Sequence, residues 1–362
     1  MAVTVKMGLA AGNPTPGDTS PQASSVVGRS EPPPSPPMLP TALNLLVTGG
    51  TGSFGRKFTE IVLAERKPER LCCYSRDELK QYEMQMAHLN ESAMRYFIGD
   101  VRDLERLRRA FEGVDVVIHA AALKQVESCE YNPREAVLTN ITGTMNVIEA
   151  AIDVGVSKVV LVSSDKAVHP VNLYGATKAC AEKLIVQGNS YSGETGPRFS
   201  VVRYGNVVGS RGSVVPLFLR QRQSGKLTLT DKRMTRFWIK LEEGVRFVLQ
   251  CLDDMVGGEI FVPKIPTVWI TTLAKVMAPD AVIEETGIRP GEKLHEVLVS
   301  EDEARHTLEF ADHFVICPPH AYWHDPHTYW KEHGGWPMRD GAKYTSDNNP
   351  HWLTVEELGE YQ

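Results

Sequence analysis

Tyr174 and Lys178 carry the clearest chemical signal in the sequence, because Tyr174 alone among eleven tyrosines has a lysine four residues on. On a helix this spacing places both side chains on one face. A lysine ammonium beside a phenol favours the phenolate, which makes the tyrosine a usable base near neutral pH. We therefore predict that this pair removes a proton from a substrate hydroxyl; an ordinary surface contact is the alternative.

A second pair, Asp165 and Lys166, directly follows an apolar run of residues 158–163. Adjacent opposite charges often form only a solvated ion pair in a loop. Their place at the end of a buried strand, where a cofactor would lie, favours a functional site instead. Asp165 and Lys166 are therefore candidate catalytic residues, together with Tyr174 and Lys178.

A glycine-rich turn, TGGTGSFG at residues 48–55, leads from the first apolar run into a helical stretch. Glycines let the backbone turn tightly and approach a pyrophosphate, which the free N–H groups and dipole of the helix then stabilise. The turn predicts a dinucleotide site. Its predicted contacts are Gly49, Thr51, Gly52, Ser53, Phe54 and Gly55.

The end of the second strand bears on the choice between NAD and NADP, since an acid there binds the ribose 2′-hydroxyl and a base accepts a 2′-phosphate. Arg76 can grip a phosphate, with Ser75 and Lys80 as further donors, so NADP is favoured. Asp77 and Glu78 keep NAD open, because either can be the acid. Further predicted cofactor contacts are Asp100, Val101, Ala120 and Ala121.

Short apolar runs alternate with helical stretches, which is typical of a parallel sheet covered on both faces. The runs are residues 43–48, 71–75, 95–99, 114–120, 158–163 and 199–204. Residues 132–154 form a crossover helix, with Pro133 in its first turn and Gly155 beyond its end. The fold class is thus a Rossmann-like, doubly wound α/β sheet with a smaller discontinuous substrate-binding domain.

The predicted domain organisation follows from changes in composition. Residues 1–42 are rich in Pro, Gly and Ser and are expected to form a disordered tail. Residues 43–205 form the NADP-binding domain, to which 236–264 return. Residues 206–235 and 265–330 form the substrate-binding domain, and 331–362 a polar C-terminal extension.

Overall composition excludes several classes of function. The formal net charge of −6 argues against nucleic acid or anionic membrane as a partner, and no run of about 18 apolar residues exists. Six cysteines lack paired spacing, so neither disulfides nor a zinc site is predicted, and a reducing cytoplasm fits best. His320, His324 and His327 suggest a metal, but Pro326 breaks their helical register, so none is expected.

Longer segments resemble a known family. The glycine turn with Tyr174 and Lys178 looks like the extended short-chain dehydrogenase/reductase superfamily, and more narrowly the chain is similar to the UDP-N-acetylglucosamine 4,6-dehydratases (inverting). The matching segments are residues 75–80 (SRDELK), 120–124, 164–178 (SDKAVHPVNLYGATK), 203–216 (RYGNVVGSRGSVVP), 234–238 and 289–296 (RPGEKLHE). They cover most of residues 43–300 in the family's order.

The resemblance implies a role for each catalytic residue. Tyr174 takes the proton of the hydroxyl at carbon 4 of the sugar while NADP⁺ accepts the hydride. Lys166, its pKa lowered by burial and by the nicotinamide, removes the hydrogen at carbon 5, and Asp165 protonates the hydroxyl that leaves carbon 6. Hydride returns to carbon 6, and Lys166 returns a proton to carbon 5 from the opposite face. No external reductant is consumed.

The resemblance also implies a UDP-N-acetylglucosamine substrate and a UDP-4-keto-6-deoxy product for bacterial surface glycan or pseudaminic acid biosynthesis. The diphosphate calls for guanidinium groups, for which Arg211, Arg236 and Arg289 are candidates. Asn140 resembles an asparagine that positions the catalytic lysine or a proton-relay water at the cofactor. Further substrate candidates are Lys124, which also reaches the cofactor, Asn206, Val214 and Glu292. A homo-oligomer, dimer-based or hexameric, is expected.

Three alternatives stay open: a retaining 4,6-dehydratase, a UDP-sugar 4-epimerase and a non-catalytic NADP-binding regulator. Ser164, Val168 and His169 differ from the usual residues of the inverting enzymes, and Ser164 also resembles the retaining relatives. Tyr174 favours inversion, since those relatives carry Met there. The sequence therefore leaves open whether the configuration at carbon 5 is inverted or retained.

Overall fold

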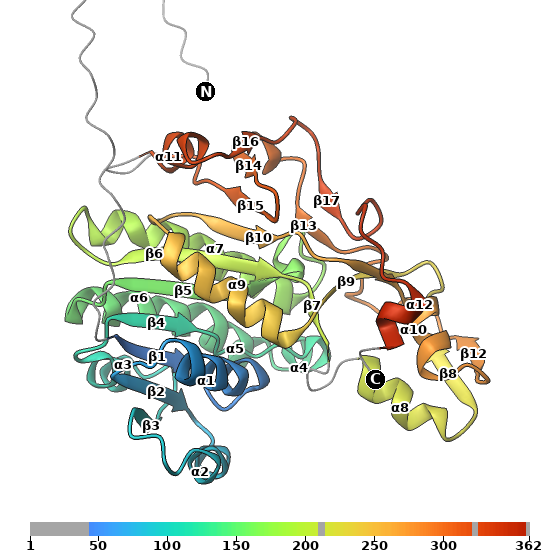
Figure 1. Ribbon diagram of the computed structural model, residues 1–362, viewed down its shortest axis with the longest axis horizontal. Helices are drawn as coiled ribbons and strands as arrows, with labels where there is room; N and C mark the ends of the chain where they lie inside the picture. The colour runs from blue at the N-terminus through green and yellow to red at the C-terminus, as the bar shows by residue number, and fades with distance from the viewer. Residues whose placement is uncertain (1–42, 209–213, 321–324, 360–362) are drawn as a thin grey trace, which may run out of the picture. The chain divides into compact units, whose positions relative to one another are not determined.

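One ten-stranded sheet dominates the computed structural model, which describes residues 43–208, 214–320 and 325–359 (Figure 1). Its parallel part consists, in spatial order, of β3 (Met94–Ile98), β2 (Arg70–Ser75), β1 (Asn44–Thr48), β4 (Val116–His119), β5 (Lys158–Ser164), β6 (Arg198–Tyr204) and β10 (Ile260–Pro263). Each apolar run predicted from the sequence overlaps one of these strands, with bounds that differ by at most two residues. The predicted α/β class and parallel sheet are confirmed.

Three antiparallel strands extend the sheet beyond β10. They are β15 (His313–Ile316), β14 (Thr307–Glu309) and β16 (Trp336–Pro337). The first two fall within residues 265–330, which were assigned to the substrate-binding part, yet they continue the main sheet. The C-terminal stretch likewise contributes β16 to it. This antiparallel edge was not predicted from the sequence.

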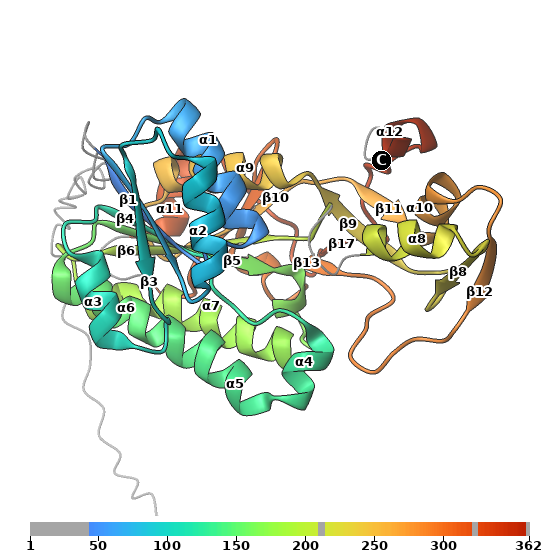
Figure 2. The same cartoon turned by 90° about the horizontal axis from the view of Figure 1, so that it is seen from below.

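Helices cover both faces of the sheet. Figure 2 shows α1 (Ser53–Glu65) and α9 (Leu241–Asp254) on one face. The other face carries α3 (Leu104–Phe111), α6 (Gly143–Val154) and α7 (Leu173–Ser192). Apart from Val162, the valine, isoleucine and leucine side chains of β1, β4 and β5 are fully buried between these layers. Each contributes about 1.5–3 kcal/mol to folding by leaving water.

The crossover between β4 and β5 is helical but irregular. After α4 (Val126–Tyr131), α5 (Pro133–Val137) begins with its proline in the first turn, as predicted. One π-helical turn at Leu138–Thr142 separates it from α6, which ends at Gly155 with a φ of 76°. Such turns often accompany functional sites, and this one carries Asn140. The remaining helix beside the first strands is α2 (Glu78–Ala87).

A second hydrophobic core lies around α8 (Val214–Arg222) and α10 (Ile270–Met277). Its strands are β8 (Lys226–Leu229) with β12 (Val282–Glu285), and β9 (Thr235–Ile239) with β7 (Asn206–Val207) and β11 (Thr267–Trp269). From the C-terminal stretch, α12 (Val355–Gly359) adds Leu358 to this core, and β17 (Tyr344–Thr345) pairs with β13 (Val297–Val299). The short α11 (Pro326–Glu332) packs near β14.

The predicted division into domains stays a prediction, since the described residues from 43 to 359 form one compact unit by their contacts. The tail predicted for residues 1–42 lies outside the described residues. Among the helices that the structure describes, none combines the length and the apolar character needed to cross a membrane.

Candidate active site

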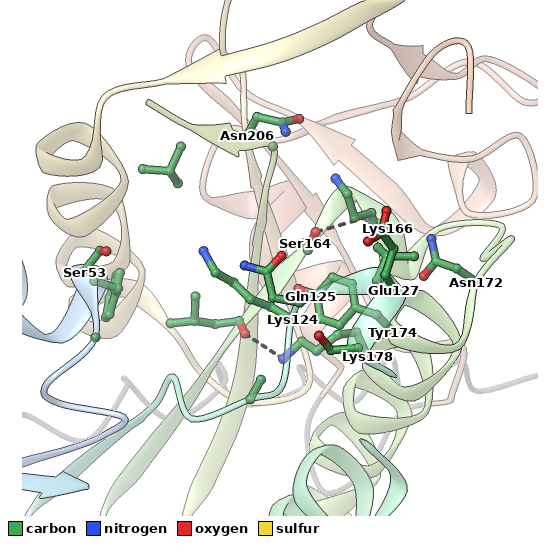
Figure 3. A pocket seen from close by; sticks show the side chains of 18 of the residues that line it. Ser53, Lys124, Gln125, Glu127, Ser164, Lys166, Asn172, Tyr174, Lys178 and Asn206 are labelled. Carbon is green, nitrogen blue, oxygen red and sulfur yellow. Dashed lines mark hydrogen bonds between the residues drawn. The ribbon is translucent and has the colours of Figure 1, made fainter. Parts of the chain in front are cut away.

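A cavity of about 1120 Å³ opens at the carboxyl ends of the parallel strands, where ligands bind in open α/β sheets. Residues after β1, β2, β3, β4 and β5 line one part of it, and residues around β7, β8, β9 and α8 line another. Figure 3 shows Ser164, Lys166, Tyr174 and Lys178 gathered at one end and Ser53 on the other side. All four predicted catalytic groups therefore lie in or directly against one pocket.

The glycine turn after β1 has the geometry of a pyrophosphate cradle. Gly49 has a φ of 69°, and a Cβ there would lie 3.0 Å from the backbone of Ala121. Helix α1 begins after Gly52 with no side-chain cap and no acid in its first turn, so its N–H groups remain available to an anion. Gly55 does not line the cavity; a Cβ on it would lie 2.4 Å from Gly50, so it allows the helix to pack on the turn.

The other predicted cofactor residues mostly surround the same space. Gly49, Thr51, Gly52, Ser53, Phe54, Asp100, Val101, Ala120 and Ala121 line the cavity. The Asp100 carboxylate lies 2.7 Å from Arg102 and 3.5 Å from Arg76. Although burial opposes ionisation, these guanidinium groups lower the pKa of Asp100. The residues present therefore fit a nicotinamide dinucleotide.

The residues after β2 differ in their availability. Ser75, Arg76, Asp77 and Lys80 line the cavity, whereas exposed Glu78 does not. Asp77 caps α2 by accepting the Lys80 backbone N–H at 3.0 Å, and its carboxylate also pairs with the Lys80 side chain. Arg76 is about half exposed, with its guanidinium beside the cavity. Asp77 is thus already engaged as a helix cap, while Arg76 can turn toward a ligand.

Tyr174 and Lys178 lie on one face of α7, as their spacing predicts, but their electrostatics differ from the prediction. The Lys178 ammonium donates to the Val162 carbonyl at 2.8 Å. Burial raises the pKa of Tyr174 to about 12, and the groups that oppose this rise are Lys166 and a hydrogen bond with Ser164. Burial lowers the pKa of Lys178 to about 8, against the pull of Glu182. Lys166 rather than Lys178 therefore favours the phenolate.

Asp165 and Lys166 form a short turn directly after β5. The Lys166 ammonium lies 3.0 Å from Asp165 and 3.5 Å from Glu296. Burial opposes its charge, yet these two carboxylates outweigh burial and raise the pKa of Lys166, so the predicted lowering is wrong for this arrangement. Asp165 is fully buried, and burial raises the pKa of its carboxyl despite Lys166. Burial thus favours the protonated form of Asp165, the acid of the pair.

Asn140 lies behind the cavity wall rather than in it. Its side chain is buried, accepts from the Leu123 N–H at 2.8 Å, and donates to the Leu123 carbonyl and to Thr177. Asn140 holds Leu123, the residue before Lys124, in place, and its predicted role at the cofactor stays a prediction. Lys124 lines the cavity, and burial followed by repulsion from Lys166 lowers its pKa.

The predicted substrate residues also separate. Asn206, Val214, Arg236, Arg289 and Glu292 line the cavity, while Arg211 lies outside the described residues. Arg236 donates to the carbonyls of Thr235 and Leu294, and Arg289 reaches Glu127 at 3.4 Å. Glu292 accepts from the Arg289 backbone N–H. Arg289 is thus the more available guanidinium, because Arg236 is tied to the protein backbone.

Several cavity residues were missed by the sequence analysis. Asn206 and Trp238 both line the cavity, and of the two only Asn206 was predicted as a site residue. Asn206 Oδ1 and Trp238 Nε1 are buried without a hydrogen-bond partner among the described residues. Such groups mark places where a ligand completes the hydrogen bonding. Glu296 and Lys293 also line it. Both lie in the family-like segment 289–296, which could have drawn attention to them.

No cluster of three metal-binding side chains occurs among the described residues. His320 and His327 are described, whereas His324 of the same predicted group lies outside the described part of the chain.

Comparisons with known proteins agree with this geometry. The polysaccharide biosynthesis protein family matches residues 45–318. A solved structure described as Pen from Bacillus thuringiensis is 40% identical, covers 88% of this chain and 96% of its own, and superposes with a TM-score of 0.79. A dTDP-glucose 4,6-dehydratase structure from Streptomyces venezuelae, with NAD and TYD bound, shares the fold at a TM-score of 0.63 and 23% identity.

Two curated relatives differ in their described activity. The UDP-N-acetylglucosamine 4,6-dehydratase (inverting) of Campylobacter jejuni is 52% identical over 320 residues, 87% of this chain and 96% of its own. The UDP-glucose 4-epimerase of Rickettsia rickettsii is 44% identical over 75% of this chain and 82% of its own. The dehydratase is thus more identical than the epimerase and matches more of this chain. This result and the family match agree with the presence of the Asp165–Lys166 pair at the site. This chain belongs to the polysaccharide biosynthesis protein family and, within it, to the family of the UDP-N-acetylglucosamine 4,6-dehydratases (inverting).

Proposed function

We propose that this chain dehydrates UDP-N-acetylglucosamine at carbons 4 to 6, with NADP as cofactor and inversion at carbon 5. The observation that carries the proposal is the pair of fully buried Asp165 and partly exposed Lys166, held 3.0 Å apart, with Lys166 lining the same cavity as Tyr174. An epimerase needs only a base at carbon 4, whereas elimination of water also needs a second base and an acid. The Campylobacter relative's described activity supports the same assignment.

The chain's own residues can supply each proton transfer. Tyr174 accepts the proton of the hydroxyl at carbon 4, favoured by the Lys166 charge and by Ser164. The glycine turn after β1 and the ends of the neighbouring strands would hold a nicotinamide dinucleotide, which would supply the hydride chemistry at carbons 4 and 6. Transfer of one proton from Lys166 to Asp165 gives a free amine and a carboxylic acid together. The amine then removes the hydrogen at carbon 5, and the acid protonates the departing hydroxyl.

A product assay tests the proposal. Purified protein incubated with NADP and UDP-N-acetylglucosamine is expected to yield a sugar nucleotide lighter by one water, with no net change in reduced cofactor. Mass spectrometry and the absorbance of the reduced nicotinamide measure these. A product of unchanged mass would identify an epimerase, and unchanged substrate would leave the chain a non-catalytic NADP-binding regulator.

Arg76 is proposed to select NADP, because its half-exposed guanidinium lies beside the cavity after β2 while Asp77 is engaged as a helix cap. Substituting Arg76→Ala is expected to weaken NADP binding about 10- to 100-fold, since charge-assisted hydrogen bonds to the 2′-phosphate are lost, and to leave NAD binding nearly unchanged. Titration calorimetry with each dinucleotide measures both affinities. Arg109→Ala, at an exposed pair with Glu112, is the matched control; equal weakening of NAD and NADP would contradict the assignment.

The second hydrophobic core is proposed to bind the nucleotide end of the substrate. Arg289, Asn206 and Trp238 present unpaired or accessible polar groups to the cavity there. Residues 206–235 and much of 265–330 remain the proposed substrate-binding part. The homo-oligomer and the cytoplasmic location stay predictions.

A further inference from the structure

Glu296 is a buried carboxylate to which neither the sequence analysis nor the proposed proton transfers give a role. It lies immediately before β13, its side chain is 4% exposed, and it lines the cavity. Its Oε1 lies 3.5 Å from the Lys166 ammonium and 3.8 Å from Arg236 Nε. Its Oε2 and Asp165 Oδ2 are both buried without a hydrogen-bond partner among the described residues. Burying two carboxylates beside one lysine is costly unless the arrangement serves a purpose.

The C-terminal part of the chain fixes Glu296 in place. Its backbone N–H donates to Ser346 Oγ at 2.9 Å, and its carbonyl accepts from the Ser346 N–H at 2.8 Å. Ser346 Oγ also lies 2.7 Å from Thr235 Oγ1. Two hydrogen bonds to Ser346 therefore hold the backbone of Glu296, and Thr235 in turn holds the Ser346 hydroxyl, although Glu296 lies far from Lys166 in the sequence.

Elimination poses an electrostatic problem that a second carboxylate solves. Lys166 becomes an ammonium when it takes the hydrogen from carbon 5, while Asp165 must still hold the proton that it gives to the leaving hydroxyl. Asp165 is then neutral, so it cannot compensate the new positive charge. The Glu296 carboxylate lies 3.5 Å from the same ammonium and can compensate its positive charge.

We propose that Glu296 is a positioning residue that stabilises the Lys166 ammonium during removal of the carbon 5 hydrogen, so that Asp165 can stay protonated as the acid. The inference rests on the proposed dehydratase function. Arg236 Nε lies 3.8 Å from the same Glu296 oxygen, Oε1, and helps to keep this carboxylate ionised. Because Ser346 hydrogen-bonds to the Glu296 backbone, this proposal gives the C-terminal stretch a part in the chemistry.

The charges around Glu296 agree with this role. The groups that face it are Lys166 and Asp165 from the turn after β5, Arg236 from β9, and Lys293 from its own segment. Although burial opposes ionisation, the three cations lower the pKa of Glu296, led by Lys166. Burial, and to a smaller degree repulsion from Glu296, raises the pKa of Asp165. The surroundings of Glu296 thus favour its ionised form, whereas burial favours the protonated form of Asp165.

The test is Glu296→Gln, which keeps the shape and removes the charge. We expect kcat to fall roughly 10- to 100-fold with KM within about threefold, because the substrate contacts remain while the ammonium is left uncompensated. The reduced nicotinamide should accumulate after mixing with substrate, since oxidation at carbon 4 continues and elimination stalls. The pH–rate profile should move to lower pH, because Lys166 and Asp165 both lose the negative charge that raises their pKa values.

A readout independent of turnover measures Lys166 itself. Reductive methylation followed by peptide mass spectrometry should label Lys166 about tenfold faster in Glu296→Gln, as expected for a pKa lower by about one unit. Ser346→Ala should shift labelling and the pH profile in the same direction by a smaller amount. Glu296→Asp should recover part of kcat. These variants keep the test meaningful if the Gln variant folds poorly.

The matched control is Glu284→Gln on β12, which breaks an exposed ion pair with Lys226 of β8. The inference is overturned if Glu296→Gln matches this control in kcat, pH profile and Lys166 labelling while the wild type dehydrates normally. It is also overturned if kcat falls with no accumulation of reduced cofactor and no change in labelling, since a merely structural role would give that result. Failure of the wild type to release water would instead refute the proposed function.

Discussion

Replacing Lys166 by alanine is expected to lower the rate of dehydration about 10³-fold, because the proposed base at carbon 5 is removed. Incorporation of deuterium at carbon 5 from heavy water should vanish from the product. Hydride removal from carbon 4 should persist, since Tyr174 remains, although more slowly, because Lys166 helps to lower the pKa of Tyr174. Mass spectrometry and stopped-flow absorbance of the reduced nicotinamide separate the two steps.

Lys232→Ala provides the matched control for this substitution. Lys232 is exposed and pairs with Glu285 at 3.6 Å, away from the cavity lining. Its removal should leave turnover and deuterium incorporation at wild-type levels. Deuterium that still enters carbon 5 in the Lys166 variant would show that another group removes that hydrogen, and the assignment of the base would have to be abandoned.

The parallel sheet could be predicted because each of its central strands is a short apolar run with β-branched residues, buried on both faces. Val116–His119 and Lys158–Ser164 illustrate this, since nearly every side chain in them is buried. The antiparallel edge could not be predicted in the same way. β14 has three residues and β16 has two, so neither is long enough to show an alternation of apolar and polar residues. Both strands are defined only by their pairing with other strands of the sheet.

The candidate site was predictable where chemistry is local in sequence. Tyr174 with Lys178, Asp165 with Lys166, and the glycine turn each lie within a few residues of one another. Glu296 reaches Lys166 only through the tertiary fold, and its position depends on Ser346. A motif can contain such a residue, as residues 289–296 do, without indicating what it contacts.

Protonation states were the least predictable feature. The spacing of Tyr174 and Lys178 correctly placed both on one helix face, yet the Lys178 ammonium donates to the Val162 carbonyl instead of lowering the pKa of the phenol. Burial was expected to lower the pKa of Lys166, but Asp165 and Glu296 together reverse the sign. A pKa depends on the sum of burial and all neighbouring charges, and that sum is known only once the neighbours are in place.

Arg203 is expected to be the most important charged residue for stability. It lies on β6, is 2% exposed, and pairs with Glu182 at 2.6 Å and with Glu303 at 3.0 Å. Substituting Arg203→Met should lower the free energy of unfolding by about 3–5 kcal/mol at neutral pH, because two largely buried carboxylates lose their partner. Denaturant titration measures the loss. Arg246→Met, at an exposed pair with Glu65 and Glu242, should unfold like the wild type.

The pH dependence of this loss identifies its cause. Burial opposes ionisation of Glu303, but Arg203 outweighs burial and brings the pKa of Glu303 down to about 2. A carboxyl whose folded pKa lies below its unfolded value of about 4.3 stabilises the fold above that value, and this contribution disappears as the pH falls toward 2. The difference in unfolding free energy between wild type and Arg203→Met should therefore shrink on acidification from about pH 5 to pH 3. A difference that stays constant over this range would mean that lost packing of the arginine stem, rather than its charge, accounts for the destabilisation.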